Sequence, residues 1–305
     1  MSTDLSKKKY EITNESIIVN GVTLYKIKAT KSFSDVKEGD FGGWIAQESN
    51  LAQEGDCWVY EGAKVYHDAK VTTNARVEGG SVFNNAAING NSVISGQAQV
   101  SGVVQVNDNA KITDSSKVYD SAVISGESEV GGYAKVGGYA KINDRAKILG
   151  NSSISGSSEV SSKAVITEYS SVTGNAKVGG KAVLQGNSKV YGSAQIIGNS
   201  LLMDRAEVYG EAIIRDSAVI MEDAQVYDNA EIKDNSRVEK DGEVFGRAVI
   251  EKGRVVTLGE KISEAPPDGF DKLKAEMTAN SAQANAKSDT LAEKLEEIAS
   301  KLPPP

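Results

Sequence analysis

Val, Ile or Leu occupies every sixth position from Val82 to Ile250, 29 times in succession. A spacing of six matches neither an amphipathic helix, whose apolar residues recur every three or four positions, nor a half-buried strand, in which they alternate. The spacing indicates a repeat architecture in which each short unit buries one aliphatic side chain before the chain turns a corner. It therefore constrains the fold strongly, whereas it carries no information about a ligand.

The other positions of the six-residue unit explain how the corner is made. With the aliphatic residue as position one, position three is Gly, Asp or Asn in 24 of 28 units, and position five is Ala or Ser in 26 of 28. Gly, Asp and Asn tolerate the left-handed backbone conformation that a sharp corner needs. A branched aliphatic residue suits a short strand, and a small residue fits inside the bend.

The aromatic residues indicate how many units complete one coil. Tyr191, Tyr209, Tyr227 and Phe245 are spaced by 18 residues, and Tyr119 falls in the same series. Three units per coil would stack these rings in one outward column. The first four residues of this set are a candidate interaction ladder for a flat, repetitive partner, such as a glycan or another protein. The alternative is that the rings only stabilise successive coils.

Four earlier units lie one residue out of phase with the main series and begin at Val59, Val65, Val71 and Val77. The offset falls around Glu78-Gly79-Gly80, where glycines can shorten a corner. With the offset allowed for, Tyr66 and Phe83 join the aromatic column, which supports triangular coils.

This pattern resembles the hexapeptide-repeat family, whose members fold as left-handed parallel β-helices. The resemblance covers residues 57–257 and implies an all-β fold of about ten to eleven triangular coils. Gly or Asp two positions after the aliphatic residue is similar to the V-Y-G-N-A-K repeats of uncharacterised phage and prophage proteins. The segment from Asp35 to Tyr60 is similar to the leader of those proteins.

The ends of the chain depart from the repeat. Residues 1–56 predict an N-terminal β cap, because Ser16–Val19 and Val22–Ile27 flank Asn20-Gly21, a strong hairpin signal. Residues 57–257 form the predicted β-helix and residues 258–267 a linker. Pro266-Pro267 precedes a segment rich in helix formers, so residues 268–305 predict a C-terminal α-helix.

Heptad spacing marks the predicted C-terminal helix, whose candidate oligomerisation residues are Leu291, Leu295, Ile298 and Leu302. Such spacing is typical of a coiled coil. The helix would form either a stalk that joins copies of the chain, with a trimer favoured, or an amphipathic helix packed on its own domain.

Residues that could carry chemistry are few, and the sequence predicts no catalytic, cofactor-binding or metal site. His67 is the single histidine, and Cys57 the single cysteine. A base paired with the adjacent Asp68 would need a geometry that a tight corner rarely holds, so we expect a solvated corner residue. Cys57 is expected to be a buried structural thiol. Calcium at corner aspartates would need two per site, and we do not expect it (Asp108, Asp144, Asp216 and Asp234).

The net charge of −8 argues against binding nucleic acid through its phosphates. No apolar run suits a signal peptide or a membrane span, so cytoplasmic synthesis is expected, with later incorporation into a virion as an option. The leading hypothesis is a non-enzymatic, elongated structural or interaction protein of phage or prophage origin, associated with a virion tail or in contact with a receptor. The alternatives are an acyltransferase-like hexapeptide-repeat enzyme, because that family is best known for trimeric acyltransferases with a His general base, and an acidic decoy of a host protein.

Overall fold

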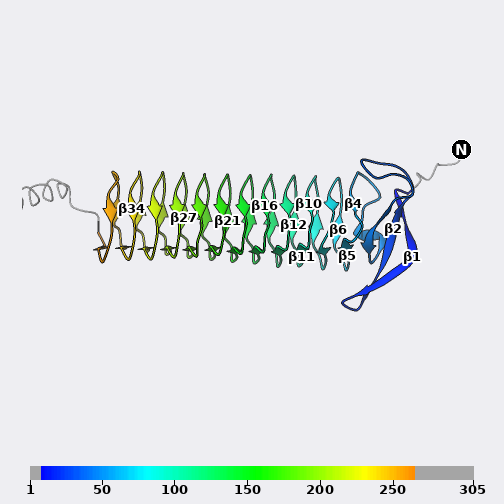
Figure 1. The fold of residues 1–305 in the computed structure, drawn as a ribbon, viewed down its shortest axis with the longest axis horizontal. Coiled ribbons are helices and arrows are strands. Elements are labelled where there is room, and N and C mark those ends of the chain that lie inside the picture. Colours follow the sequence, from blue (N-terminus) through cyan, green and yellow to red (C-terminus); the bar gives the residue numbers. More distant parts are fainter. Residues whose placement is uncertain (1–7, 265–305) are drawn as a thin grey trace, which may run out of the picture. The chain divides into compact units, whose positions relative to one another are not determined.

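The structure, a computed structural model, describes residues 8–264 (Figure 1). Three strands at the N-terminus are followed by 35 strands of two residues each, which succeed one another at regular intervals along the chain. The 35 short strands form three parallel sheets, here called sheets I, II and III, and the chain visits the sheets in turn. Each circuit of the three sheets is one coil.

Sheet I contains β5 (Lys64–Val65), β8 (Ser81–Val82), β11 (Gln99–Val100), β14 (Lys117–Val118), β17 (Lys135–Val136), β20 (Ser153–Ile154), β23 (Ser171–Val172), β26 (Lys189–Val190), β29 (Glu207–Val208), β32 (Gln225–Val226), β35 (Glu243–Val244) and β38 (Lys261–Ile262). Sheet II contains β4 (Trp58–Val59), β7 (Arg76–Val77), β10 (Val93–Ile94), β13 (Lys111–Ile112), β16 (Glu129–Val130), β19 (Lys147–Ile148), β22 (Val165–Ile166), β25 (Val183–Leu184), β28 (Leu201–Leu202), β31 (Val219–Ile220), β34 (Arg237–Val238) and β37 (Val255–Val256). Sheet III contains β6 (Lys70–Val71), β9 (Ala87–Ile88), β12 (Gln105–Val106), β15 (Val123–Ile124), β18 (Lys141–Ile142), β21 (Glu159–Val160), β24 (Lys177–Val178), β27 (Gln195–Ile196), β30 (Ile213–Ile214), β33 (Glu231–Ile232) and β36 (Val249–Ile250).

The register of the sheets confirms a coil of three units. Val100 pairs with Val82 on one side and with Val118 on the other, 18 residues away in each direction. The coil that runs from Val65 to Val82 has one residue fewer, which confirms the short corner near Gly80. The fold is all-β and has the architecture of the left-handed parallel β-helix class, with about 12 coils rather than the ten to eleven expected.

The core is a thin column of side chains from positions one and five. The aliphatic residues from Val82 to Ile250 have no exposed surface at position one apart from Val178, which is 1% exposed. Ala and Ser at position five are buried beside them, as at Ala194 and Ser188. Burying each Val, Ile or Leu contributes about 1.5–3 kcal/mol, so the core gains stability in small equal steps along the rod.

The corners use the left-handed conformation that the sequence predicts. Gly192 has φ of 71° and Asp108 has φ of 60°. An aspartate at position three also has a second role, because its carboxylate accepts a hydrogen bond from the backbone N–H of the corner residue in the next coil. Asp114 Oδ2 accepts from Gly132 N at 2.7 Å, and Asp108 Oδ2 from Gly126 N at 2.9 Å. These bonds satisfy donors that the sheets leave unpaired.

The N-terminal cap joins a hairpin to the first coils. Strands β1 (Tyr10–Val19) and β2 (Val22–Ala29) form the antiparallel hairpin, and β3 (Phe41–Ile45) pairs antiparallel with β2 and parallel with β5. A short 3₁₀ helix, η1 (Glu48–Asn50), follows β3. The cap covers sheet edges that would otherwise pair with another chain.

At the other end, β38 lies within the segment that the sequence analysis assigned to a linker. The corner from Val256 to Lys261 retains the six-residue spacing, although Leu258 and Gly259 replace the usual corner residues. The predicted C-terminal helix of residues 268–305, with Leu291, Leu295, Ile298 and Leu302, lies outside the described residues.

Tight stacking of corners predicts that replacing Gly156 by Ala destabilises the fold more than replacing Gly253. Both glycines have positive φ, but a Cβ at Gly156 would lie 2.6 Å from Gly174 O, whereas a Cβ at Gly253 would meet nothing within 4 Å. The conformational penalty of about 1–2 kcal/mol is common to both. Thermal unfolding followed by circular dichroism measures the difference. Equal losses for G156A and G253A would contradict the role given to coil packing.

Asp35, in the N-terminal cap, should make the stability of the fold depend on pH. Tyr60 Oη donates to Asp35 Oδ1 at 2.8 Å and Arg76 Nη2 donates to Oδ2 at 3.0 Å, and the Tyr60 bond is the main cause that lowers the pKa of Asp35. The resulting stability is present above the ordinary carboxyl pKa of about 3.9 and is lost as the pH falls through the lowered value. Melting temperatures measured down to about pH 3 should fall more steeply for the wild type than for D35N. The exposed Glu11→Gln variant should follow the wild type.

Candidate functional site

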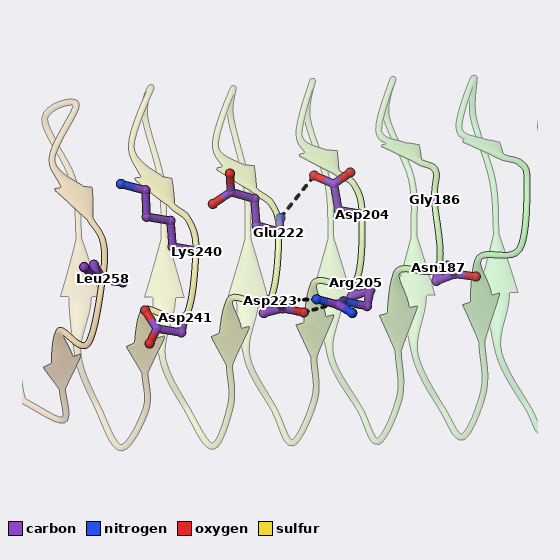
Figure 2. A pocket seen from close by; sticks show the side chains of 9 residues that line it. All are labelled: Gly186, Asn187, Asp204, Arg205, Glu222, Asp223, Lys240, Asp241 and Leu258. Atoms are coloured by element: carbon purple, nitrogen blue, oxygen red, sulfur yellow. Dashed lines mark hydrogen bonds and ion pairs between the residues drawn. The ribbon is translucent and has the colours of Figure 1, made fainter.

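A groove of about 770 Å³ runs along the edge between sheets II and I in the later coils (Figure 2). Its lining residues recur at intervals of 18 because each coil contributes the same two corner positions. They are Gly186, Asn187, Asp204, Arg205, Glu222, Asp223, Lys240, Asp241 and Leu258. The groove is therefore a surface of stacked corners, and its chemistry is set by corner side chains.

Most charges in this groove already have partners. Arg205 donates to both carboxylate oxygens of Asp223 at 2.6 Å, and this hydrogen bonding raises the pKa of Arg205. Asp204 Oδ2 accepts from Glu222 N at 3.2 Å, and Asp241 Oδ1 accepts from Gly259 N at 2.7 Å. In Figure 2 these groups lie along consecutive coils. They order the edge rather than forming a reactive group.

Another groove, of about 630 Å³, follows the edge between sheets III and II. Arg145 lies on it and forms an ion pair with Glu127 at 2.8 Å. Interleaved pairs of this kind also join Lys147 to Glu129 across adjacent coils, at 2.9 Å. Ion pairs between coils break up the continuous acidic face that a decoy of a nucleic-acid-binding protein requires.

His67 has a more ordered environment than a solvated corner predicts. Its backbone has φ of 54°, and its carbonyl oxygen accepts hydrogen bonds from Asn50 Nδ2 at 2.8 Å and Gln47 Nε2 at 3.0 Å. Its ring Nδ1 lies 3.0 Å from Asn84 Oδ1, and the ring packs edge-on against Tyr66. The side chain itself remains exposed. The cap thus holds the backbone of His67, whereas Asn84 in the next coil holds the imidazole.

The partner of His67 is Asn84 and not the adjacent Asp68. Asp68 Oδ1 accepts from Gln47 Nε2 at 3.5 Å. Asn84 is one coil further along at the same corner, 17 residues away because this coil is the short one. The offset in the repeat was the sequence signal that could have identified this pair.

Cys57 is fully buried beneath the cap, as expected for a structural thiol. Lys9 Nζ donates to Cys57 O at 2.8 Å and to Gly55 O at 3.2 Å, and it lies 3.2 Å from Cys57 Sγ. Burial lowers the pKa of Lys9. The Lys9 amine donates to backbone carbonyl groups at the end of the β-helix, where no further coil supplies N–H donors. This hydrogen bonding explains why a lysine is buried at the junction with the cap.

The aromatic column forms as the spacing predicts. The rings of Tyr191, Tyr209, Tyr227 and Phe245 stack with centroids 4.8, 4.9 and 5.1 Å apart and planes within 6° of parallel. Burial raises the pKa of Tyr191 to about 12. Each inner ring has both faces covered by its neighbours, so the column presents ring edges to a partner. A flat ligand has no free inner face on which to stack.

The most exposed tyrosines lie elsewhere, at corner positions. Tyr133 and Tyr169 are 65% exposed and lie on the edge between sheets II and I, and Tyr139 is 69% exposed on the edge between sheets I and III. They lie outside the predicted ladder, because its aromatic residues occupy position two. Their placement at position four, two residues beyond the ladder position, was the available signal.

No group of three or more His, Cys, Asp or Glu side chains within residues 8–264 is arranged to hold a metal ion. The corner carboxylates bond to backbone instead, as Asp144 does to Ser162 N at 2.9 Å and Asp234 to Lys252 N at 2.8 Å. Across the same range, the structure contains no helix of the length and apolarity needed to cross a membrane.

Comparison with known proteins gives one informative sequence match. No family model matches the chain. A stretch of 40 residues is 52% identical to the Escherichia coli (strain K12) protein named "Uncharacterized acetyltransferase YdcK", and covers 13% of this chain and 12% of that protein. The solved structure of Arabidopsis UDP-N-acetylglucosamine acyltransferase is similar over 60% of this chain and 66% of that chain, with 13% identity and a TM-score of 0.32.

The leading hypothesis of a non-enzymatic structural protein of phage or prophage origin was wrong. The sequence relative is named an acetyltransferase, which favours the acyltransferase-like alternative. That sequence relative is a protein of Escherichia coli (strain K12) and not of a phage. The error has a physical cause, because the repeat spacing reports on coil geometry, which a structural rod and an enzyme share.

Ring stacking in the aromatic column should stabilise the fold, and this effect can be measured separately from that of the tyrosine hydroxyl groups. Replacing Tyr209 by Ser removes two stacked pairs and should cost about 1–3 kcal/mol. Replacing it by Phe retains both pairs and loses a single bond to Gln225, of 3.4 Å, so this variant should melt near the wild type. Thermal unfolding checks both, with Tyr139→Ser as the control because that ring is exposed. Equal melting temperatures for Y209S and Y209F would contradict the stacking account.

Proposed function

We propose that the protein is an acyltransferase-like enzyme that transfers an acetyl group from a thioester donor to an amine or hydroxyl acceptor. The observation that carries the proposal is the 40-residue stretch that is 52% identical to a protein named an acetyltransferase. The stacked coils add a rigid scaffold, on which corner side chains hold fixed positions. The resemblance to hexapeptide-repeat acyltransferases supplies the further expectation of a histidine base.

His67 is the residue that we assign as the general base. When Nδ1–H of His67 donates a hydrogen bond to Asn84 Oδ1, the imidazole presents an unprotonated Nε2 to solvent. Asn50 and Gln47 hold the backbone of His67, so the ring needs little reorganisation to receive a substrate. A base that is exposed, oriented and held in this manner suits proton transfer from a bound acceptor.

The reaction would follow from this placement. Nε2 of His67 removes a proton from the acceptor while the acceptor nitrogen or oxygen forms a bond to the thioester carbonyl carbon. The tetrahedral intermediate then collapses, the carbon–sulfur bond breaks, and the proton passes from the imidazolium to the departing thiolate. Asn84 Oδ1 stabilises the imidazolium by accepting a hydrogen bond from its Nδ1–H throughout.

Replacing His67 by Asn tests this assignment without breaking the corner. Asn tolerates positive φ, and Asn84 occupies the equivalent corner of the next coil with φ of 60°. H67N should retain the melting temperature and lose acetyl transfer by about 100-fold or more. Release of free thiol from an acetyl thioester, measured against a panel of amines and sugars, reports the activity. The matched control is Asp68→Asn, which should retain it.

Two results would contradict the proposal. One is a wild-type protein that neither binds an acetyl thioester in calorimetry nor releases thiol with any acceptor. The other is full activity in H67N, which would retain the reaction class but remove His67 as the base.

A further inference from the structure

One stretch of the edge between sheets II and I alternates aromatic and amide side chains. This stretch, here called the platform, consists of the position-four residues of four consecutive coils: Tyr133, Asn151, Tyr169 and Asn187. Both tyrosines are 65% exposed, and both asparagines are exposed as well. In the following coils the same position holds Arg205 and Asp223, which form an ion pair (Figure 2). The platform is therefore an uncharged row on an edge that becomes charged further along.

The backbone holds the platform side chains at a regular interval. The backbone N–H of Tyr133 donates to Gly150 O in the next coil at 2.7 Å, and the other coils of the platform repeat this bond. Because neighbouring strands lie about 4.8 Å apart, Tyr133 and Tyr169 are separated by about 9.6 Å along the rod. Rings one coil apart stack, as Tyr191 and Tyr209 do with centroids 4.8 Å apart. At twice that interval the two platform rings do not cover each other.

The polar groups of the platform have no partner among residues 8–264. Neither the two tyrosine hydroxyls nor the two asparagine amides take part in a hydrogen bond or ion pair there. The aromatic column differs, because Tyr191 Oη donates to Glu207 Oε2 at 3.2 Å. The nearby carboxylate of Glu168 is already engaged and accepts from Gly186 N at 2.7 Å. The platform thus offers uncovered rings and unused neutral hydrogen-bonding groups in alternation.

We propose that the platform binds an extended, uncharged β-1,4-linked glycan whose chain runs along the rod. In such a glycan each pyranose ring is turned over relative to its neighbours and advances the chain by nearly the distance of one coil. Every second sugar therefore presents the same face, and Tyr133 and Tyr169 each stack on one of these sugars. The sugar between them lies over Asn151, whose amide donates to and accepts from its hydroxyl groups. Asn187 contacts the fourth sugar in the same way.

Other elongated ligands fit the platform less well. A nucleic acid or an anionic glycan needs cationic side chains beside its charges, and the platform residues carry none. The coils follow one another in a straight row in Figure 1, whereas an α-1,4-linked glycan curls away from a straight row within a few sugars. The platform and His67 lie on different edges, because His67 is at a corner between β5 in sheet I and β6 in sheet III. The inference is therefore independent of the proposed acetyl transfer.

Calorimetric titration of the full-length chain with tetrasaccharides tests the proposal. The wild type should bind cellotetraose, N-acetylchitotetraose or both, which share the β-1,4 linkage and differ in the substituent at C2. Whichever of the two binds more tightly identifies the sugar. Maltotetraose, which has α-1,4 linkages, should bind at least about tenfold more weakly, because it cannot contact both tyrosines.

Removing the platform rings should remove binding without unfolding the protein. The double variant Y133A/Y169A should bind the preferred tetrasaccharide at least about tenfold more weakly, because two stacking surfaces are lost. Y133F/Y169F retains both rings and should retain most of the affinity. The matched control is Tyr139→Ala, which removes a tyrosine of 69% exposure from the edge between sheets I and III and should bind as the wild type does. All these variants should melt close to the wild type, since the altered side chains are exposed.

Exchanging the residues at positions 151 and 169 tests the spacing at constant composition. In N151Y/Y169N the two tyrosines of the platform lie one coil apart, so their rings should stack on each other as those of Tyr191 and Tyr209 do. The two rings then no longer meet alternate sugars, and affinity should fall by at least about tenfold.

Four results would overturn the proposal. A wild type that binds neither β-1,4-linked tetrasaccharide would exclude the ligand class, and equal affinity for maltotetraose would exclude recognition of an extended chain. Unchanged affinity in Y133A/Y169A would place binding elsewhere on the rod. Unchanged affinity in N151Y/Y169N would remove the argument from the two-coil interval.

Discussion

The left-handed corner at position three is the feature on which the rest of the structure depends. A residue with positive φ lets the chain turn sharply enough for three two-residue strands to close one coil. Because the corners between Val82 and Ile250 all have positive φ at position three, each coil places its backbone groups directly over those of the next, as at Gly156 and Gly174. This register between coils has three consequences. The parallel strands form continuous hydrogen bonds, the aliphatic residues form one buried column, and the aromatic rings stack.

The same constraint confines function to the outside of the rod. The residues at positions one and five are buried in the core, so a ligand or partner can contact only the corner residues and the outward-facing strand residues. Departures from the repeat at those positions are therefore the informative ones. His67, at a corner held by the cap, is such a departure, and its exposed side chain does not contribute to the core.

Much of the fold could be predicted from the sequence, because the buried and the turning residues each follow a strict spacing. Val82 to Ile250 identified the core, and Tyr191 to Phe245 identified the coil length. The contacts of the corners were harder to predict. Asp114 caps Gly132, and His67 meets Asn84, across 18 and 17 residues respectively. Such pairs become visible only when the coils are stacked. The biochemical activity was predicted wrongly in the leading hypothesis, because spacing alone does not distinguish a structural rod from an enzyme.

The central functional claim is that the corner at His67 is where acetyl transfer takes place. A crystal structure of the protein with a bound, non-hydrolysable acetyl thioester analogue tests it most directly. The account predicts the analogue's carbonyl carbon beside the imidazole, with Nε2 facing the space that an acceptor would fill. An analogue bound elsewhere on the rod, with His67 left in solvent, would contradict it.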